Sequence, residues 1–265
     1  MTDSSDTAVY LYGVTRGLDP AVLGDSPGVA GAPVRGVATG DLTALVSTVR
    51  LDEYGEEALR ANLEDLAWIE TTARAHHAVV DRAARVAPTA PVRIATVYHD
   101  DERVSQVLRE GRERFGTALD RITGRSEWGV KAYAYPEDDR PAEEAVPSAT
   151  GGGSGPAGAG TAYLRRRQEQ RRRRTEAGRR LSERAQAIDA ELRVHAVAVR
   201  RHPPQDPKLS GHAGTPILNV AYLLDDARVP EFQALVRDID ERSPGIGVEM
   251  TGPWPPYSFI ETDGA

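Results

Sequence analysis

The chain has 265 residues, of which 40% are hydrophobic and 28% are charged, a composition typical of one large or two ordinary folded domains. The absence of cysteine excludes disulfides, thiolate catalysis and cysteine-ligated metal centres, and the formal net charge of −7 argues against general affinity for nucleic acids. Because the sequence opens without a signal-peptide pattern and contains no apolar run of membrane-spanning length, we expect a cytoplasmic protein.

Residues 1–125 are expected to form an α+β domain. β-branched and aromatic residues indicate a strand at Ala8–Val14, and two further strands within Val34–Val49 are expected to form a hairpin that turns at Thr39–Asp41. Apolar residues then recur at a helical period, which predicts one long helix over Glu56–Val86. The expected buried stripe of this helix comprises Leu59, Leu63, Leu66, Ala73, Val80 and Ala84.

A short strand and a second helix complete this domain. The strand is predicted within Pro91–Asp101, and Asp100 or Asp101 can cap the following helix by accepting its free amide hydrogens. The apolar face of that helix comprises Val104, Val107, Leu108, Gly111, Phe115, Leu119 and Ile122. Gly124 is expected to end it.

Residues 126–252 are expected to form a second domain with the element order βαββαβ. The predicted strands are Trp128–Tyr135, Arg193–Arg200, Pro216–Leu224 and Ile246–Met250. The inward face of the helix before the last strand comprises Phe232, Leu235, Val236 and Ile239. This order is that of a ferredoxin-like domain, so the predicted fold class is α+β with two domains, the second ferredoxin-like.

Two unusual segments interrupt the second domain. Residues 136–160 are acidic at first and then almost purely glycine, alanine, serine and proline, which predicts a flexible insertion because such a sequence can bury little surface. Residues 161–192 predict a long arginine-rich helical extension, with ten arginines against four acidic residues between Thr161 and Ala190. Its apolar stripe occupies only the second half and comprises Ala177, Leu181, Ala185, Ile188 and Leu192.

The arginine-rich helix has three interpretations: a solvated arm, a contact for acidic proteins, or a contact for nucleic acid or a membrane. Arginine and glutamate residues four positions apart can neutralise part of the charge, and no aromatic residues are interleaved for base stacking. We therefore favour the first two interpretations, and a ferredoxin-like nucleic-acid-binding module that uses this helix stays the alternative function. The candidate partner contacts are Arg171, Arg172, Arg173 and Arg174.

No set of residues predicts an active site, and the sequence contains no known nucleophile motif. The GxGxxG pattern at Gly153–Gly158 follows no predicted strand, so we interpret it as chance. His76, His77 and Asp81 could supply metal ligands, but no other histidine has a suitable spacing; we expect one of the two histidines at the core edge and the other exposed. Neighbouring carboxylates lie where helix capping explains them. We expect no enzyme activity, no metal and no cofactor.

Residues 253–265 form a tail rich in proline and aromatic residues, which follows Gly252. Such a segment can serve as a polyproline ligand for another protein, or it can dock on its own chain. We favour internal docking of Trp254, Tyr257 and Phe259, because the prolines restrict the unfolded backbone and free aromatic surface invites aggregation. Truncation before Gly252 is then expected to lower thermal stability.

Three stretches of the sequence resemble the GvpL/GvpF family of gas vesicle proteins. The terminal TGPWPPYSFI (residues 251–260) is similar to the family's carboxyl-terminal signature and is the most specific of the three. The opening VYLYGV (residues 9–14) and APTAPVRIATVYHDDERVSQVLREG (residues 87–111) support it. The chain departs from the family pattern at Ile94–Ala95, where the family has Phe-Gly, and in its long glycine-rich insertion.

The resemblance implies a non-enzymatic role in gas vesicle formation. Members of this family are regarded as minor vesicle components or assembly factors, which contact the small hydrophobic shell protein and accessory gas vesicle proteins during nucleation. The resemblance also implies two α+β domains, the second ferredoxin-like with a helical extension, in a cytoplasmic protein associated with gas vesicles. Nucleic acid and membranes are not among the expected partners, and the oligomeric state and the F or L type stay open.

Overall fold

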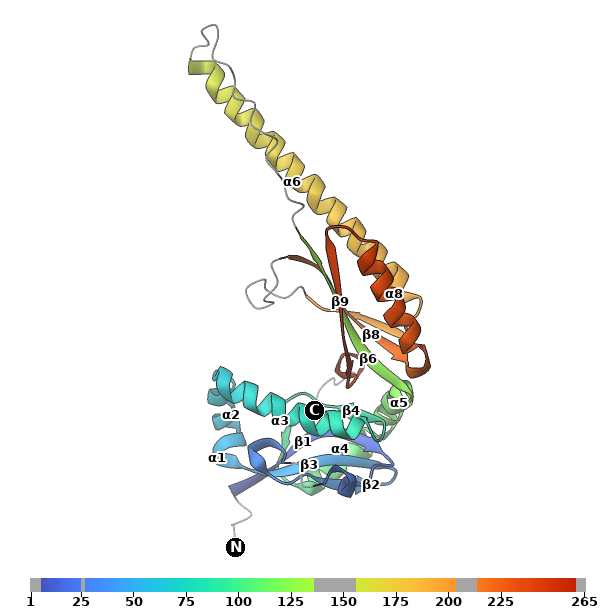
Figure 1. Cartoon of the computed structure of the whole chain (residues 1–265). Helices are drawn as coiled ribbons and strands as arrows, with labels where there is room; N and C mark the ends of the chain where they lie inside the picture. The colour runs from blue at the N-terminus through green and yellow to red at the C-terminus, as the bar shows by residue number, and fades with distance from the viewer. Residues whose placement is uncertain (1–5, 25–26, 136–155, 204–213, 261–265) are drawn as a thin grey trace. The chain divides into compact units, whose positions relative to one another are not determined.

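Figure 1 shows the protein as a computed structural model, which describes residues 6–24, 27–135, 156–203 and 214–260. Most of the expected flexible insertion, 136–155, lies outside the described residues. The chain divides into two compact units. Unit 1 comprises Met1–Trp128, Tyr222–Ala227 and Thr251–Ala265, and unit 2 comprises Gly129–Ala221 and Arg228–Met250. The carboxyl-terminal segment therefore belongs to the same unit as the amino-terminal residues.

Unit 1 is built around a five-stranded antiparallel sheet in the order β2-β3-β1-β4, with β5 also paired with β1. The strands are β1 (Thr7–Arg16), β2 (Arg35–Thr39), β3 (Leu42–Arg50), β4 (Thr89–Pro91) and β5 (Val97–Tyr98). Among the described residues, the short 3₁₀ segments are η2 (Pro20–Leu23), η3 (Val29–Gly31), η4 (Asp226–Arg228) and η5 (Tyr257–Phe259). The strand that the sequence predicts within Pro91–Asp101 is thus reduced to β5, because the pairing with β1 is interrupted after β4.

The hairpin of β2 and β3 confirms the turn predicted at Thr39–Asp41. Thr39 pairs with Leu42, and Gly40 between them has a φ angle of 64°. This left-handed conformation favours glycine, because a side chain there would crowd the following carbonyl group. The residue type at the turn therefore sets the register of the two strands.

Two helices replace the single helix predicted over Glu56–Val86, so that prediction is wrong. They are α2 (Glu56–Asn62) and α3 (Leu66–Ala84), and the short helix α1 (Leu51–Tyr54) precedes them. Asp65 causes the break before α3, because its carboxylate accepts hydrogen bonds from the amides of Ala67 and Trp68. An N-cap of this kind starts a new helix at a defined residue.

The break also changes which residues of this region are buried. Leu66, expected in the buried stripe, is 80% exposed, and Leu63 is exposed as well. The buried face of α3 instead comprises Thr72, His76, Val79, Val80 and Ala83. These positions follow a helical period that starts after the break, so the stripe is shifted around the helix relative to the predicted one.

The second predicted helix is found as two helices, α4 (Asp101–Glu110) and α5 (Arg112–Ile122), which are separated at Gly111. Asp100 caps α4 by accepting a hydrogen bond of 2.8 Å from the amide of Arg103, which confirms one of the two predicted caps. The predicted apolar face is otherwise confirmed, with Val104, Val107, Leu108, Phe115, Leu119 and Ile122 all buried. This face packs on the sheet of unit 1.

Strand β1 is buried on both faces, between α4 and α5 on one side and α3 on the other. Leu11 belongs to the apolar cluster beneath α4 and α5, whereas Tyr10 and Tyr12 belong to the cluster beneath α3. The register against β3 shifts between Leu11 and Gly13, so that Val14 returns to the same cluster as Leu11. A β-bulge of this kind reverses the alternation of side chains along the strand.

Unit 2 contains most of a four-stranded sheet in the order β7-β8-β6-β9, and Figure 1 shows α6 and α8 side by side along it. The elements are β6 (Arg125–Ala134), α6 (Pro156–Arg193), β7 (Ala198–Arg201), β8 (Thr215–Asp225), α8 (Val229–Glu241) and β9 (Ile246–Trp254). The element order is as predicted, but α6 begins before residue 161 and β7 is shorter than Arg193–Arg200. In the described part of the chain, no helix combines the length and apolarity that a membrane span needs.

Candidate functional site

The carboxyl-terminal segment of unit 1 is held by a buried carboxylate. The backbone amide of Ser258 donates a 2.8 Å hydrogen bond to Oε2 of Glu127, and the Ser258 hydroxyl donates one of 2.7 Å to Oε1. Glu127 lies at the start of β6 and is buried. Burial raises the pKa of its carboxyl above the usual range, whereas the two hydrogen bonds from Ser258 act to lower it.

The three rings predicted to dock differ in exposure. Phe259 is 6% exposed, whereas Tyr257 is 36% and Trp254 is 43% exposed. Ile260, which follows Phe259 and was not among the predicted docking residues, packs in the apolar cluster beneath α4 and α5. The centroid of the Trp254 ring lies 5.7 Å from that of the His77 ring, and the centroid of the Tyr257 ring lies 6.2 Å from it. The two exposed rings therefore contact a side chain on α3.

The close approach of this segment to β6 explains the residue at position 252. Gly252 has a φ angle of 134°, and a Cβ atom there would lie 2.9 Å from the Trp128 ring and 3.0 Å from the Glu127 carbonyl oxygen. Only glycine suits both this conformation and this space.

His76 lies in the core of unit 1, not at its edge as expected. Its Nδ1 atom is 3.0 Å from the Tyr10 hydroxyl, which also accepts a hydrogen bond from the Ala95 amide. Nε2 is buried and has no hydrogen-bond partner among the described residues. Burial lowers the pKa of His76 to about 4.

In the part of the chain that the structure describes, no three His, Asp or Glu side chains are grouped so that they could hold a metal ion. Asp225 and Asp226, which are adjacent in the sequence, each contact a side chain at the start of β6. Asp225 pairs with Arg125 at 2.8 Å, and Asp226 accepts a hydrogen bond of the same length from Ser126.

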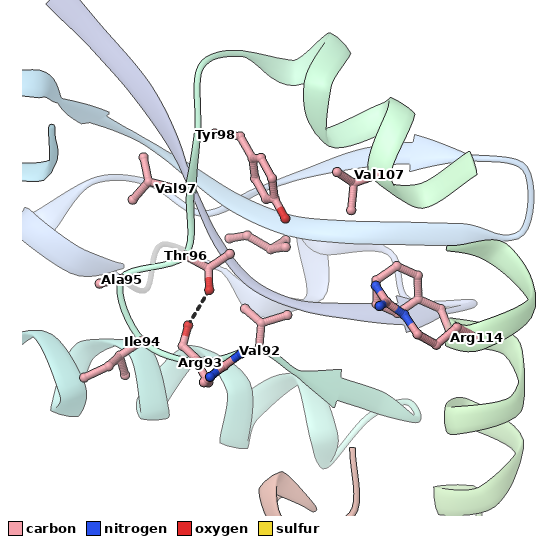
Figure 2. A pocket seen from close by; sticks show the side chains of 11 residues that line it. Val92, Arg93, Ile94, Ala95, Thr96, Val97, Tyr98, Val107 and Arg114 are labelled. Atoms are coloured by element: carbon pink, nitrogen blue, oxygen red, sulfur yellow. Dashed lines mark hydrogen bonds between the residues drawn. The ribbon is translucent and has the colours of Figure 1, made fainter. Parts of the chain in front are cut away.

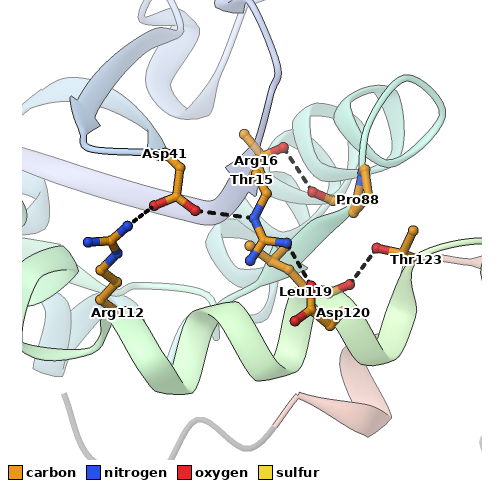
Figure 3. Close-up of polar contacts among 8 residues, drawn as sticks. All are labelled: Thr15, Arg16, Asp41, Pro88, Arg112, Leu119, Asp120 and Thr123. Atoms are coloured by element: carbon orange, nitrogen blue, oxygen red, sulfur yellow. Dashed lines mark hydrogen bonds and ion pairs between the residues drawn. The ribbon is translucent and has the colours of Figure 1, made fainter.

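A charged cluster connects the β2–β3 turn with α5 (Figure 3). Arg16 pairs with Asp120 at 2.6 Å and lies 3.4 Å from Asp41, which also pairs with Arg112 at 3.0 Å. Hydrogen bonding to its own backbone amide, followed by the charge of Arg112, lowers the pKa of Asp41. Asp41, Arg112 and Asp120 are exposed and Arg16 is half-buried, and each has an opposite charge beside it, which indicates a surface ion-pair network rather than a reactive site.

A cavity of about 430 Å³ lies in unit 1 beside the segment that joins β4 to β5. Figure 2 shows that segment passing along one side of the cavity, with Tyr98 and Arg114 directed into the same space. Apolar side chains of β1, α4 and α5 form the opposite wall, including Leu11, Val107 and Phe115. No local pattern in the sequence indicates this cavity, because it depends on an interruption of strand pairing.

Helix α6 has two different halves. Ala185, Ile188 and Leu192 are buried, and the buried carboxylate of Asp189 accepts a hydrogen bond of 2.7 Å from Arg193. In the first half, every described side chain from Arg165 to Glu176 is exposed except that of Glu176, which is half-buried. Only this second half therefore belongs to the packed core of unit 2.

The candidate contact residues lie in the exposed half of α6. Arg171, Arg172 and Arg173 are exposed, and the side chain of Arg174 lies outside the described residues. Arg172 pairs with Glu176 at 3.0 Å, and Arg173 lies 3.8 Å from Glu169. Exposed pairs of this kind contribute little to stability and exchange readily with other charges.

A sequence model of the family described as gas vesicle synthesis protein GvpL/GvpF matches residues 8–261. The chain belongs to the GvpL/GvpF family. Gas vesicle protein L of Streptomyces sp. (strain CB03234) is 42% identical over 261 residues, which cover 97% of this chain and 94% of that protein. Gas vesicle protein F of the same strain is 27% identical over 267 residues, which cover 96% of this chain and 100% of that protein.

Two solved structures have a similar fold. The crystal structure of the gas vesicle protein GvpF from Anabaena sp. PCC7120 has a TM-score of 0.68 at 19% identity, covering 97% of this chain and 98% of that one. The crystal structure of gas vesicle protein GvpF from Microcystis aeruginosa has a TM-score of 0.64 at 17% identity, covering 96% and 99%. The mixed α and β fold of this GvpL/GvpF member, with two antiparallel sheets, is therefore shared with GvpF structures.

Proposed function

We propose that this member of the GvpL/GvpF family acts in gas vesicle formation as a non-enzymatic assembly factor or minor structural component. It binds the gas vesicle shell protein and accessory gas vesicle proteins while the shell is nucleated, and it acts in the cytoplasm in association with the vesicle. Family membership over residues 8–261 supports the gas vesicle role. The physical need is clear, because a subunit that forms an apolar wall exposes aggregation-prone surface before it assembles.

The proposal that α6 contacts the partner proteins rests on the exposed first half of this helix. It presents Arg171, Arg172 and Arg173 on a helix whose described side chains form no apolar face in this region, and Arg174 follows them in the same run. Acidic surfaces of shell or accessory proteins are the complementary partners for such a helix, since charge complementarity speeds encounter and selects partners. The strand order β7-β8-β6-β9, with α6 and α8 between strands in sequence, supports a ferredoxin-like unit as the base of this arm.

The experiment is capture of the purified shell protein and accessory gas vesicle proteins by the full chain at low and high salt. We expect capture to fall as salt rises, and to fall strongly when Arg171, Arg172, Arg173 and Arg174 are all changed to Glu. The matched control changes four exposed arginines of unit 1 to Glu, namely Arg60, Arg74, Arg85 and Arg109. Both variants change the net charge by the same amount, so the control should retain capture.

Unchanged capture by the α6 variant would reject the role of the arm. An equal loss in both variants would also reject it, because net charge and not the helix would then explain binding. Binding of RNA in a gel shift, lost in the α6 variant, would favour the alternative nucleic-acid-binding function.

A further inference from the structure

A groove of about 330 Å³ lies in unit 2 between α6 and the first residues of β8. Its apolar lining consists of Leu181 and Ala185 from α6 and of Ile217 and Leu218 from β8. Leu181 and Ile217 are only half-buried. The groove therefore leaves apolar side chains open to solvent near the middle of α6.

Gly178 lines the same groove, although nothing in its surroundings requires a glycine. It is exposed, and a Cβ atom at this position would meet no other atom within 4 Å. Glycine within a helix is less favourable than alanine, because it loses more backbone freedom on folding. The missing side chain keeps the groove open along α6.

The face of α6 that is buried in its second half continues as arginines beyond the groove. Steps of three and four residues along this face lead from Leu192 through Gly178 to Arg171 and Arg167. Figure 1 shows that α6 runs on beyond the sheet of unit 2 in this direction. Arg171 and Arg167 are exposed, and neither forms an ion pair with another described residue. Their guanidinium groups are therefore available to a partner.

The glutamates of this part of α6 lie on the opposite face. They recur every seven residues and lie about half a turn around the helix from Gly178. Their ion pairs are Arg173–Glu169, Arg172–Glu176 and Arg179–Glu183. The two faces of the arm are thus different, with mutually paired charges on one and an apolar groove followed by unpaired arginines on the other.

We infer that the groove face of α6 binds an acidic amphipathic helix of a partner protein. Apolar side chains of that helix enter the groove, and its carboxylates pair with Arg171 and Arg167. The inference rests on the proposed function and names the face of α6 and the kind of segment that this function uses. Apolar burial supplies affinity that exposed ion pairs lack, and the complementary charges select the partner and its register.

A helix fits this surface because the groove and the arginines lie along one straight axis. Arg171 is about 10 Å and Arg167 about 16 Å from Gly178 along that axis, at a rise of about 1.5 Å per residue. A partner helix that lies alongside α6 presents side chains at the same intervals. Recognition of this kind places the apolar anchors of a helix in a groove.

The direct test is binding of a fluorescent, alanine-based helical peptide to the full chain, followed by anisotropy. The peptide carries two Leu residues four positions apart and two Glu residues seven and eleven positions beyond the second Leu, which are the spacings of Arg171 and Arg167 from Gly178. A control peptide of the same composition has both Glu residues moved by two positions, so that they point to the other side. We expect the control to bind at least about tenfold more weakly. Equal binding of the two peptides, or no binding of either, would overturn the inference.

Paired variants of the full chain separate the two faces of α6. The double variant Arg167→Gln with Arg171→Gln removes two charges from the groove face, and Arg172→Gln with Arg173→Gln removes two from the opposite face. The first should weaken binding of the peptide and of the purified gas vesicle proteins about tenfold, and the second by less than about twofold. Equal effects would overturn the inference and leave the proposed function intact. Only unchanged capture after reversal of the whole arginine run from Arg171 to Arg174 rejects the proposed role of the arm.

The variant Gly178→Leu separates binding from folding. Its side chain has room in the groove and leucine is the better helix former, so the melting temperature should be at least that of the unchanged chain. Peptide binding should nevertheless fall at least about tenfold, because the groove is filled. Ala177→Leu, at an exposed position that does not line the groove, should leave binding unchanged. Unchanged binding by Gly178→Leu would overturn the inference, and so would a dimer of the full chain that Gly178→Leu abolishes, since a second copy would then occupy the groove.

Discussion

Ser258 donates hydrogen bonds to both carboxylate oxygens of Glu127, although 131 positions separate the two residues in the sequence. The contact joins the carboxyl-terminal segment to the start of β6 within unit 1. Because the carboxylate is buried, its charge depends on these two donors. The segment is therefore held by a specific polar contact as well as by the apolar side chains of Phe259 and Ile260.

Removal of the Ser258 hydroxyl should destabilise the protein in a pH-dependent way. At pH 7, Ser258→Ala leaves the buried charge of Glu127 with one donor fewer, and we expect a loss of about 1.5–3 kcal/mol in the free energy of unfolding. The loss should shrink as the pH falls towards 4.5, because the carboxyl then becomes protonated. Urea unfolding at both pH values measures this, with Ser182→Ala on the exposed side of α6 as the control. An equal loss at both pH values would contradict the prediction.

The contribution of Glu127 to the free energy of unfolding should fall as the pH rises. Its pKa is raised in the folded protein, so the folded state binds more protons than the unfolded state between the two pKa values. Stability from this group is then present at low pH and lost as the pH rises through that window. This sign is opposite to that of a surface carboxylate in an ion pair.

Truncation before Gly252 should lower the melting temperature. The truncation removes Phe259 and Ile260 from the core, each worth about 1.5–3 kcal/mol, so we expect a fall of at least about 5 °C in calorimetry. In the full chain, Phe259→Ala should cost more stability than Trp254→Ala, since Trp254 is far more exposed. If melting is unchanged but partner capture disappears, the segment is a ligand for another protein and internal docking is wrong.

His76 should make stability depend on pH in the acid range. Its pKa is about 4 in the folded protein against 6.5 for an unperturbed histidine, so the unfolded state binds the extra proton first. The stability that this group contributes is complete above pH 6.5 and is lost as the pH falls towards 4, by up to about 3 kcal/mol. His76→Gln should flatten this dependence in urea unfolding series. The exposed His99→Gln should not; if both variants behave alike, the buried imidazole is not the cause.

Ala95 is held in a backbone conformation that favours glycine. Its φ angle is 61°, and it lies in the segment beside the unit 1 cavity. Ala95→Gly should raise the free energy of unfolding by about 0.5–1 kcal/mol, as strain relief exceeds the added chain entropy. Ala38→Gly in β2 is the matched control and should destabilise by a similar amount. A destabilising Ala95→Gly would show that the strain is absent.

Local chemistry in the sequence was enough for many elements. The β2–β3 turn followed from Gly40, the start of α4 from Asp100, and the apolar face of α4 and α5 from helical spacing. The break before α3 had a signal too, since Asp65 stands immediately before an apolar run and caps the new helix. The long apolar repeat outweighed that signal in the prediction, which therefore placed Leu66 in the core.

His76 was misplaced for a similar reason. It shares the helical spacing of Thr72, Val79, Val80 and Ala83, all of which are buried, but a polar residue in such a stripe is ordinarily assigned to the edge. Its burial depends on the Tyr10 hydroxyl, which is 66 positions away in the sequence. No local pattern contains that hydrogen bond.

The sequence by itself determined the family, the order of the elements in unit 2 and the charge of α6, because each depends on residues close together in the chain. The tertiary structure alone decided that Ser258 meets Glu127, that Ile260 enters the core, and that a cavity opens beside Tyr98. These features depend on contacts between distant segments and on a shift of strand pairing. The order of residues along the chain does not show which distant segments meet or where strand pairing shifts. The same alternation of side chains is compatible with several registers until packing selects one.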